Sequence, residues 1–376
     1  MRRASERERE QLNDIFAALC TIESPTGHER ACADRVAAEL RALGLEVDED
    51  GAGPAAGSDA GNLLARIPGT GSESVMLCAH MDTVPALAPI EPVRIDGGWR
   101  NANEAILGAD NKVAVAALLV LAARLAQTPA QVGVELLFTV GEETALAGAK
   151  EFETGILRSR VGYAFDSAAP VGGVVMASPT YYRIAAELRG VAAHAGLRPE
   201  RGRSAIVAAA RAIARMPLGR IDEESTANIG TISGGSAANV VPERCLIMGE
   251  TRSLDAARAE QLASEIAECL ADGANDPECE CDLDVSVERQ FEGYRARPAS
   301  AEVVLAFDAL RACGFEPTPL TTGGGSDANV LRARGLGVLN LANGTERNHE
   351  PSERVTAVSL EAVLDLGIAL VERAGP

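Results

Sequence analysis

A nearly unbroken apolar run at Val132–Val140 is the feature that most restricts the possible folds of this chain. A strand with so few polar side chains must be covered on both faces, which is typical of the middle of a parallel sheet. A strong helix is predicted just before it, at Asp110–Ala126, and strands are predicted at Asn62–Ile67 and Ser74–Ala79. This alternation predicts an α/β domain with a largely parallel mixed sheet flanked by helices.

The pattern changes in the middle of the chain. Alternating strands are predicted at Tyr181–Gly190, Thr226–Ser233, Arg244–Leu254 and Cys279–Val287, with helices at Ala205–Met216 and Ala256–Leu270. This βαββαβ order predicts an α+β domain with both helices on one face of an antiparallel sheet. The α/β character returns after Pro298. We therefore expect one domain formed by 1–178 and 293–376, interrupted by an inserted domain at 179–292.

Composition excludes several classes of protein. The net charge of −19 argues against a general nucleic-acid binder, because phosphate contacts require surplus cations. No apolar run approaches the ~20 residues needed to span a bilayer, and the N-terminal residues do not resemble a targeting segment, so we expect no membrane association. The eight cysteines form no CxxC pair and are interpreted as reduced thiols of a cytoplasmic protein.

Polar residues that could bind a metal follow the predicted strands of the α/β domain. They are His80 with Asp82, Asp110, the pair Glu142–Glu143, Asp166 and His349. Open α/β sheets bind their ligands at the carboxyl ends of the strands, so these side chains are expected to converge on one edge. Each residue alone has an ordinary structural explanation, but their ordered combination is a strong signal. Nitrogen and carboxylate ligands without cysteine suit Zn²⁺, Co²⁺ or Mn²⁺.

Other catalytic motifs are absent from the sequence. Neither His28 nor His349 starts an HExxH motif, because Cys32 and Glu353 stand where the second histidine would be. The glycine-rich segments lack the lysine of a phosphate-binding loop, and no GxSxG motif occurs.

The motifs together resemble one family. In order along the chain they are AHMDTVP, LGADNK, FTVGEET, FDS, GVAAHAG, ANVVPE, ETRSLD, GGGSDAN and NHE. They are similar to those of the cocatalytic zinc peptidases that include peptidase T, glutamate carboxypeptidase, aminoacylase and succinyl-diaminopimelate desuccinylase. GADNK and TGGGSDAN resemble the peptidase T-like branch most, although Asn111 replaces the second acid of GADDK. The inserted domain falls where that family has its lid and dimerisation domain.

The resemblance implies a dinuclear metal centre, with Zn²⁺ as the expected ion. Asp110 would bridge two ions, His80 and Asp166 would complete one site, and Glu143 and His349 the other. Glu142 would be the general base for the bridging water. Asp82 would orient the ring of His80. The family also implies a cis peptide bond between Asp110 and Asn111, which we predict here.

The resemblance also assigns roles outside the metal ligands. His194 would stabilise the oxyanion, in dimeric relatives from the partner subunit, so a homodimer through the inserted domain is expected. Asn239 and Arg252 would contact substrate, although Arg252 could equally form a surface salt bridge. The glycines before Ser326, including Gly324, could bring backbone N–H groups to substrate.

Two enzymatic functions and one non-enzymatic function fit these residues. The leading hypothesis is a tripeptide aminopeptidase acting on short peptides, because Asp166 is typical of di- and tripeptidases in this family. The alternative is an aminoacylase- or carboxypeptidase-type deacylase, acting on N-acyl amino acids with the same metal centre. A non-catalytic binding protein is disfavoured, since the five ligands and the base are all present.

Overall fold

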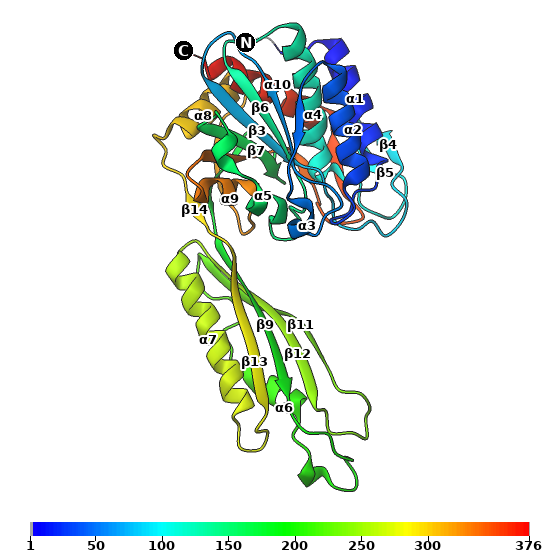
Figure 1. The fold of residues 1–376 in the computed structure, drawn as a ribbon, viewed down its shortest axis with the longest axis vertical. Helices are drawn as coiled ribbons and strands as arrows, with labels where there is room; N and C mark the ends of the chain where they lie inside the picture. The colour runs from blue at the N-terminus through cyan, green and yellow to red at the C-terminus, as the bar shows by residue number, and fades with distance from the viewer. Residues whose placement is uncertain (1–2, 376) are drawn as a thin grey trace. The chain divides into compact units, whose positions relative to one another are not determined.

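The computed structural model describes residues 3–375 and divides the chain into two compact units. The first unit contains the chain up to Met176 and from Ala296 onward, and the second runs from Ala177 to Arg295. Each unit has its own sheet (Figure 1). Each also has its own hydrophobic core. Among the described residues, no helix is both long and apolar enough to cross a membrane.

A mixed sheet forms the centre of the first unit. Its strands in spatial order are β1 (Val47–Glu49), β2 (Leu63–Ile67), β6 (Gly133–Thr139), β3 (Ser74–His80), β7 (Val161–Ser167), β16 (Gly337–Ala342), β8 (Gly173–Ser178) and β14 (Tyr294–Arg295), with β15 (Thr318–Thr321) paired to β8. The middle strands β6, β3, β7 and β16 run parallel to one another. Every residue of β6 is buried, so the apolar run identified the sheet centre correctly.

Helices flank this sheet, which confirms the predicted fold class. The longer helices are α1 (Glu6–Cys20), α2 (Arg30–Ala42), α4 (Ala109–Gln127), α8 (Ala301–Cys313) and α10 (Ala357–Arg373); shorter ones are α3 (Gly53–Ala56), α5 (Ala147–Glu151), α9 (Asp327–Ala333) and a 3₁₀ turn at Thr154–Ile156. Nearly all of α4 is buried, because it packs against the sheet and against α1 and α10.

A small antiparallel sheet was not predicted from the sequence. Its strands are β17 (Thr345–Glu346), β18 (Arg354–Thr356), β5 (Gly98–Asn101) and β4 (Pro92–Ile95). The turn between β17 and β18 carries His349, so this sheet fixes both ends of the segment that holds this histidine.

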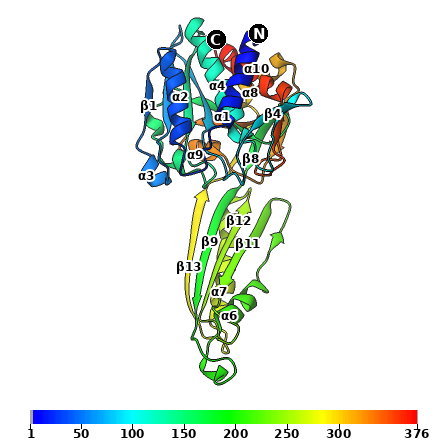
Figure 2. The ribbon, with the colours of Figure 1, turned by 90° about the vertical axis from the view of Figure 1, so that its right-hand side faces the viewer.

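The second unit has the predicted βαββαβ order (Figure 2). Its antiparallel sheet contains, in spatial order, β10 (Gly219–Arg220), β11 (Ser225–Gly234), β12 (Arg244–Ser253), β9 (Thr180–Arg189) and β13 (Asp282–Phe291). The helices α6 (Ala205–Ile213) and α7 (Ala256–Ala274) cover one face, and a 3₁₀ turn lies at Pro199–Arg201. Alternate residues of β9, Ile184, Ala186 and Leu188, are buried in this helix-covered core.

Candidate metal centre

The predicted ligands leave one edge of the first unit's sheet. His80 is the last residue of β3, Asp166 is close to the end of β7, and Glu142 and Glu143 follow β6. Asp110 is in the first turn of α4, and His349 lies in the turn between β17 and β18. The parallel direction of β3, β6 and β7 brings their carboxyl ends to this edge.

The ligand side chains form two groups that share Asp110. In the first group, His80 Nε2 lies 3.4 Å from Asp110 Oδ1 and 3.4 Å from Asp166 Oδ1. In the second group, His349 Nε2 lies 2.9 Å from Glu143 Oε1 and 3.5 Å from Asp110 Oδ2. Asp110 therefore presents one carboxylate oxygen to each group. The peptide bond between Asp110 and Asn111 is cis, as predicted.

The donor atoms fit a pair of divalent cations. His80 Nε2 and Asp110 Oδ1 are buried and have no hydrogen-bond partner, which is unusual for buried polar atoms. The donor atoms within each His–carboxylate group lie within 4.8 Å of one another. Imidazole nitrogen and carboxylate oxygen without thiolate are a suitable ligand set for Zn²⁺, Co²⁺ or Mn²⁺.

Burial and crowding of like charges shift the pKa values of these groups. Burial raises the pKa of Asp166 to about 7, although His80 acts against this rise. Burial also raises the pKa of Glu142 well above its usual value, and the charge of Asp166 adds to the effect. Hydrogen bonds to Asp110 and Glu143 raise the pKa of His349 to about 10. Without metal, the cluster therefore retains protons at neutral pH, and bound cations would displace them.

Asp82 contacts both sides of the site. The Nδ1 atom of His80 lies 3.0 Å from the backbone oxygen of Asp82 and 3.4 Å from its carboxylate, so the backbone oxygen is the nearer partner. The carboxylate accepts the backbone N–H groups of Glu142 at 3.0 Å and Glu143 at 3.1 Å, and the hydroxyl of Thr26 at 2.7 Å. Asp82 therefore holds the turn that carries both glutamates.

Sequence reasoning missed three residues near the centre. Asn348 Nδ2 donates to Asp110 Oδ2 at 2.7 Å. Glu353 accepts the backbone N–H of Asp110 at 2.9 Å. Asp327 is buried and accepts the hydroxyl of Thr139, at the end of β6, at 2.5 Å. Asn348 adjoins His349, and Asp327 lies in the GGGSDAN motif, but no local pattern marks Glu353 as a partner of Asp110.

Ser326 and Gly324 lie in the loop before α9. Ser326 is buried and forms a capping box with Asn329 at the start of this helix. The backbone N–H of Gly324 donates to Thr322 Oγ1 at 3.1 Å. Both residues therefore have local partners that explain their positions.

The remaining predicted residues lie in the second unit. The His194 side chain is exposed, and its backbone forms an isolated antiparallel β-bridge with Val240. The N–H of the next residue, Ala195, donates to the backbone oxygen of Asn239 at 2.9 Å. Arg252 lies on β12, where it pairs with Glu250 at 3.0 Å and stacks on Tyr181 at 4.4 Å. His194 follows the end of β9 and Arg252 is paired with its start. The length of β9 therefore separates them, about 30 Å at ~3.3 Å per residue.

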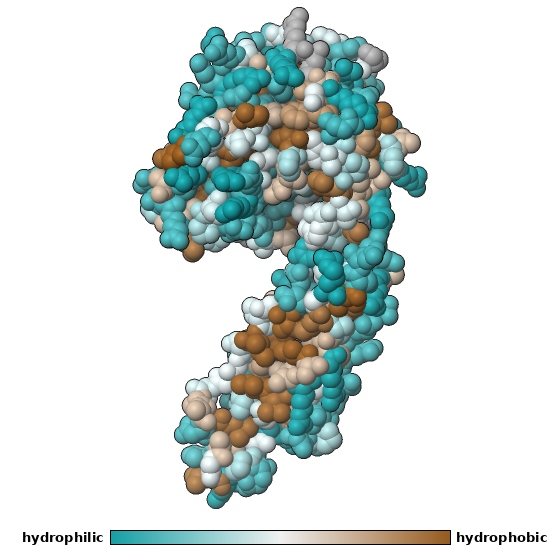
Figure 3. Space-filling model, turned by 180° about the vertical axis from the view of Figure 1, so that it is seen from behind, coloured by the Kyte–Doolittle hydropathy of each residue, from teal (hydrophilic) through white to brown (hydrophobic). Residues whose placement is uncertain are grey.

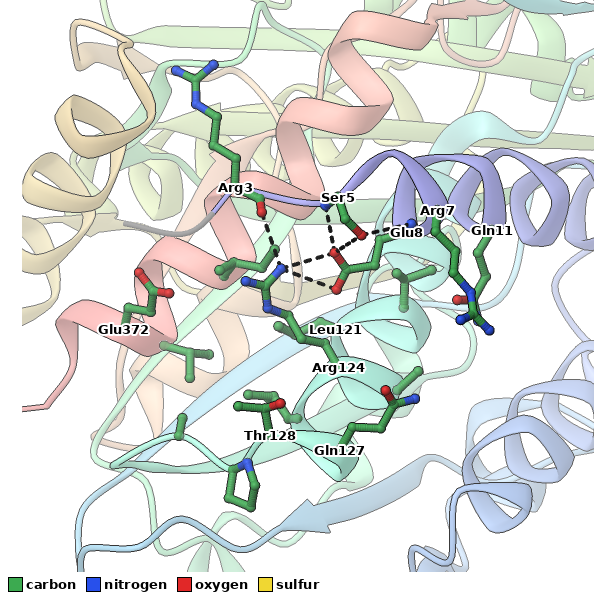
Figure 4. Close-up of a pocket in the computed structure, with 17 residues that line it drawn as sticks. Arg3, Ser5, Arg7, Glu8, Gln11, Leu121, Arg124, Gln127, Thr128 and Glu372 are labelled. Atoms are coloured by element: carbon green, nitrogen blue, oxygen red, sulfur yellow. Dashed lines mark hydrogen bonds and ion pairs between the residues drawn. The ribbon is translucent and has the colours of Figure 1, made fainter.

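A cavity of about 750 Å³ lies elsewhere in the first unit (Figure 4). It is lined by the start of α1, the end of α4 and the end of α10. Asp110 begins α4 whereas Arg124 lies near its end, so about 21 Å of helix separates this cavity from the candidate metal centre. Arg124 donates to both oxygens of Glu8 at 3.2 Å there.

Comparisons with known proteins identify the family. Residues 182–277 match the peptidase dimerisation domain of the M20 peptidases, and residues 62–195 match peptidase family M28. The uncharacterized protein YqjE of Bacillus subtilis (strain 168) is 34% identical over 366 residues, which cover 97% of this chain and 98% of the relative.

Solved structures agree with this assignment. Aminopeptidase PepT from Bacillus cereus ATCC 10987 has a TM-score of 0.85 and 36% identity, over 97% of this chain and 98% of that one. A tripeptidase from Staphylococcus aureus subsp. aureus Mu50 has a TM-score of 0.90 and 33% identity, with the same coverage. The chain therefore belongs to the peptidase T-like branch of the M20 metallopeptidases, a family of metal-dependent peptide hydrolases with a dinuclear centre.

Proposed function

We propose that this chain is an aminopeptidase for short peptides, tripeptides above all, with Zn²⁺ as its metal. The observation that carries the proposal is the position of Asp110, whose two carboxylate oxygens face two different His–carboxylate groups. At the same edge of the sheet stands Glu142, whose backbone N–H is held by Asp82. The likeness to an aminopeptidase and a tripeptidase, each above 30% identity over nearly the whole chain, supports this substrate class.

In this proposal, His80, Asp110 and Asp166 would hold one ion, and Asp110, Glu143 and His349 would hold the other. Two bound divalent cations would activate water and polarise the scissile carbonyl. Glu142 takes the proton of the attacking water and delivers it to the leaving amine. Burial, with the charge of Asp166 adding to it, raises the pKa of Glu142, the direction that makes a carboxylate a stronger proton acceptor.

A deacylase is the second candidate. A probable carboxypeptidase of Paracoccidioides brasiliensis (strain Pb03) is 30% identical over 275 residues, which cover 63% of this chain and 60% of that protein. The test is to compare kcat/KM of the zinc-loaded protein for free-amine tripeptides and for matched N-acetyl amino acids. We expect the tripeptides to be preferred by at least tenfold; a preference for the N-acetyl compounds would favour the deacylase.

We further propose that the protein acts as a homodimer formed through the second unit. Among the described residues, ten of the fifteen exposed large hydrophobic side chains lie in this unit, and Figure 3 shows hydrophobic surface gathered there. A tripeptide spans only ~10 Å, so it is too short to contact both His194 and Arg252 of one chain. A second copy would supply His194 and its neighbour Asn239, while Arg252 would contact the substrate bound in its own chain.

Free cysteines are consistent with a reducing compartment. No disulfide forms among the eight cysteines, which all lie in the described part of the chain, and seven of the eight are buried. We therefore place the enzyme in the cytoplasm.

A further inference from the structure

Glu353 connects two loops that are far apart in the sequence. It lies four residues after His349, directly before β18, and it is 1% exposed. Its Oε2 atom accepts the backbone N–H groups of Leu107 and Gly108, each at 2.8 Å. Its Oε1 atom accepts the backbone N–H of Asp110 at 2.9 Å. One carboxylate therefore binds the loop that begins α4 through three hydrogen bonds.

These three donors require an acceptor with two oxygens. They belong to the first turn of α4 and the residues before it, where N–H groups have no partner within the helix. A glutamine at 353 would replace one oxygen with an NH₂ group, which would face at least one N–H donor. The geometry therefore selects glutamate over its uncharged isostere.

The backbone of the loop that carries His349 is strained. Arg347 and His349 both have left-handed backbone conformations, with φ values of 58° and 66°. Residues other than glycine adopt this conformation at a cost, and it persists where surrounding contacts hold it. The His349 side chain is 49% exposed, so packing around the ring gives it limited support. By contrast, His80 is buried at the end of a central strand.

We propose that Glu353 is a positioning residue that keeps the carboxylate of Asp110 close to His349, so that both can bind the same ion. This inference rests on the proposed metal centre. In the first group, two of the three ligands, His80 and Asp166, stand on β3 and β7 and do not need the connection. The group formed by Glu143, His349 and the second oxygen of Asp110 does need it. Loss of Glu353 therefore weakens the second metal site selectively.

The test is to titrate metal-free protein with Co²⁺ and follow both the stoichiometry and the visible absorption spectrum. We expect the wild-type protein to bind two ions. The variant Glu353→Gln should bind the first with affinity within about twofold of wild type and the second at least tenfold more weakly, since loss of such supporting contacts costs ~10–100-fold. Wild-type affinity for both ions in this variant would overturn the inference.

Glu135 provides a matched control. It is 2% exposed and accepts the backbone N–H groups of Arg158 and Ser159 and the Ser159 hydroxyl at 2.6–3.0 Å. It lies on β6, about 23 Å along the chain from Glu142. Glu135→Gln should lower the melting temperature but bind two Co²⁺ ions normally. If Glu353 had only a structural role, Glu353→Gln would weaken the binding of both ions equally. This result would also contradict the inference.

A measurement on the wild-type protein covers the case in which Glu353→Gln does not fold. The amides of Leu107, Gly108 and Asp110 should be protected from hydrogen exchange in the metal-free protein, because Glu353 already accepts them. Exchange at the rate of unprotected amides would overturn the inference. If the wild-type protein binds fewer than two Co²⁺ ions, the proposed metal centre itself is wrong, and this result is distinct from a failure of the Glu353 role.

Discussion

The carboxylate of Asp82 accepts the backbone N–H of Glu142 at 3.0 Å, across 60 residues of sequence. The same carboxylate accepts the N–H of Glu143 at 3.1 Å. Glu29, which is also buried, accepts the N–H of the preceding residue, Gly141, at 3.1 Å. Two buried carboxylates thus fix the backbone of this turn, so adjacent glutamates can be directed to different tasks, one as a metal ligand and one as a base.

The first prediction concerns the base. Glu142→Gln should bind two zinc ions but lose at least 10²–10⁴-fold in kcat on a tripeptide, because general-base catalysis contributes about that much. Metal content by elemental analysis and steady-state kinetics measure the two effects separately. Glu143→Gln is the comparison, and it should lose the second ion as well as activity. Near-normal kcat in Glu142→Gln with both ions bound would rule out this base.

The second prediction concerns pH and stability. The pKa of His349 is raised to about 10 in the metal-free protein, so its stabilising contribution is complete below about pH 6.5 and is lost as the pH rises through 10. Burial raises the pKa of Asp166 to about 7, so the native state retains a proton that the unfolded state releases near pH 4. Both groups therefore make the metal-free protein less stable as the pH rises.

Bound cations should reverse this trend, because they replace the protons of the cluster. We expect the difference in free energy of unfolding between zinc-loaded and metal-free protein to increase steadily from pH 5.5 to pH 9. Urea unfolding with zinc and with a chelator measures it. A difference that stays constant over this range would show that the cluster does not exchange protons for metal.

The third prediction concerns assembly. His194→Ala and Glu142→Gln should each be nearly inactive alone, and mixing them should restore activity if His194 acts in the partner's site. Hybrid dimers would then contain one site with both intact residues. Subunit exchange must be demonstrated separately, for example with differently tagged chains. Exchanged dimers without activity would show that His194 does not act across the interface.

Much of the fold followed from hydrophobic periodicity. The centre of the main sheet and both helices of the second unit were predicted within a few residues, because each buries a regular apolar pattern. The edge strand β13 was placed too early, at Cys279–Val287, since its last third is polar. Cys279 and Cys281 are buried in the core although they precede the strand.

Local contacts explain further differences. Apolar spacing alone predicts a helix from Gln11 to Cys20, but α1 begins at Glu6, because Ser5 and Glu8 form a capping box that extends the helix into a charged segment. The sequence alone predicts a surface loop from Gly51 to Gly61, but this stretch contains the short helix α3, in which Gly53 and Ala56 are buried. The small sheet was missed because its strands have only two to four residues, too few for a periodic signal.

The candidate site was predictable wherever its residues follow strong strands. His80, Glu142, Glu143 and Asp166 all do so, and their convergence follows from the direction of the sheet. Glu353 was not predictable, because its partners are backbone N–H groups more than 240 residues away in the sequence. Contacts between a side chain and a distant backbone leave no pattern in the local sequence.

The most direct test of this account is the zinc dependence of tripeptide hydrolysis. Metal-free protein is titrated with Zn²⁺ while free-amine tripeptide cleavage and bound zinc are measured together. We predict negligible activity without metal, two ions bound per chain at saturation, and release of the N-terminal amino acid. Full activity in the metal-free protein, or saturation with no cleavage of any short peptide, would contradict the account.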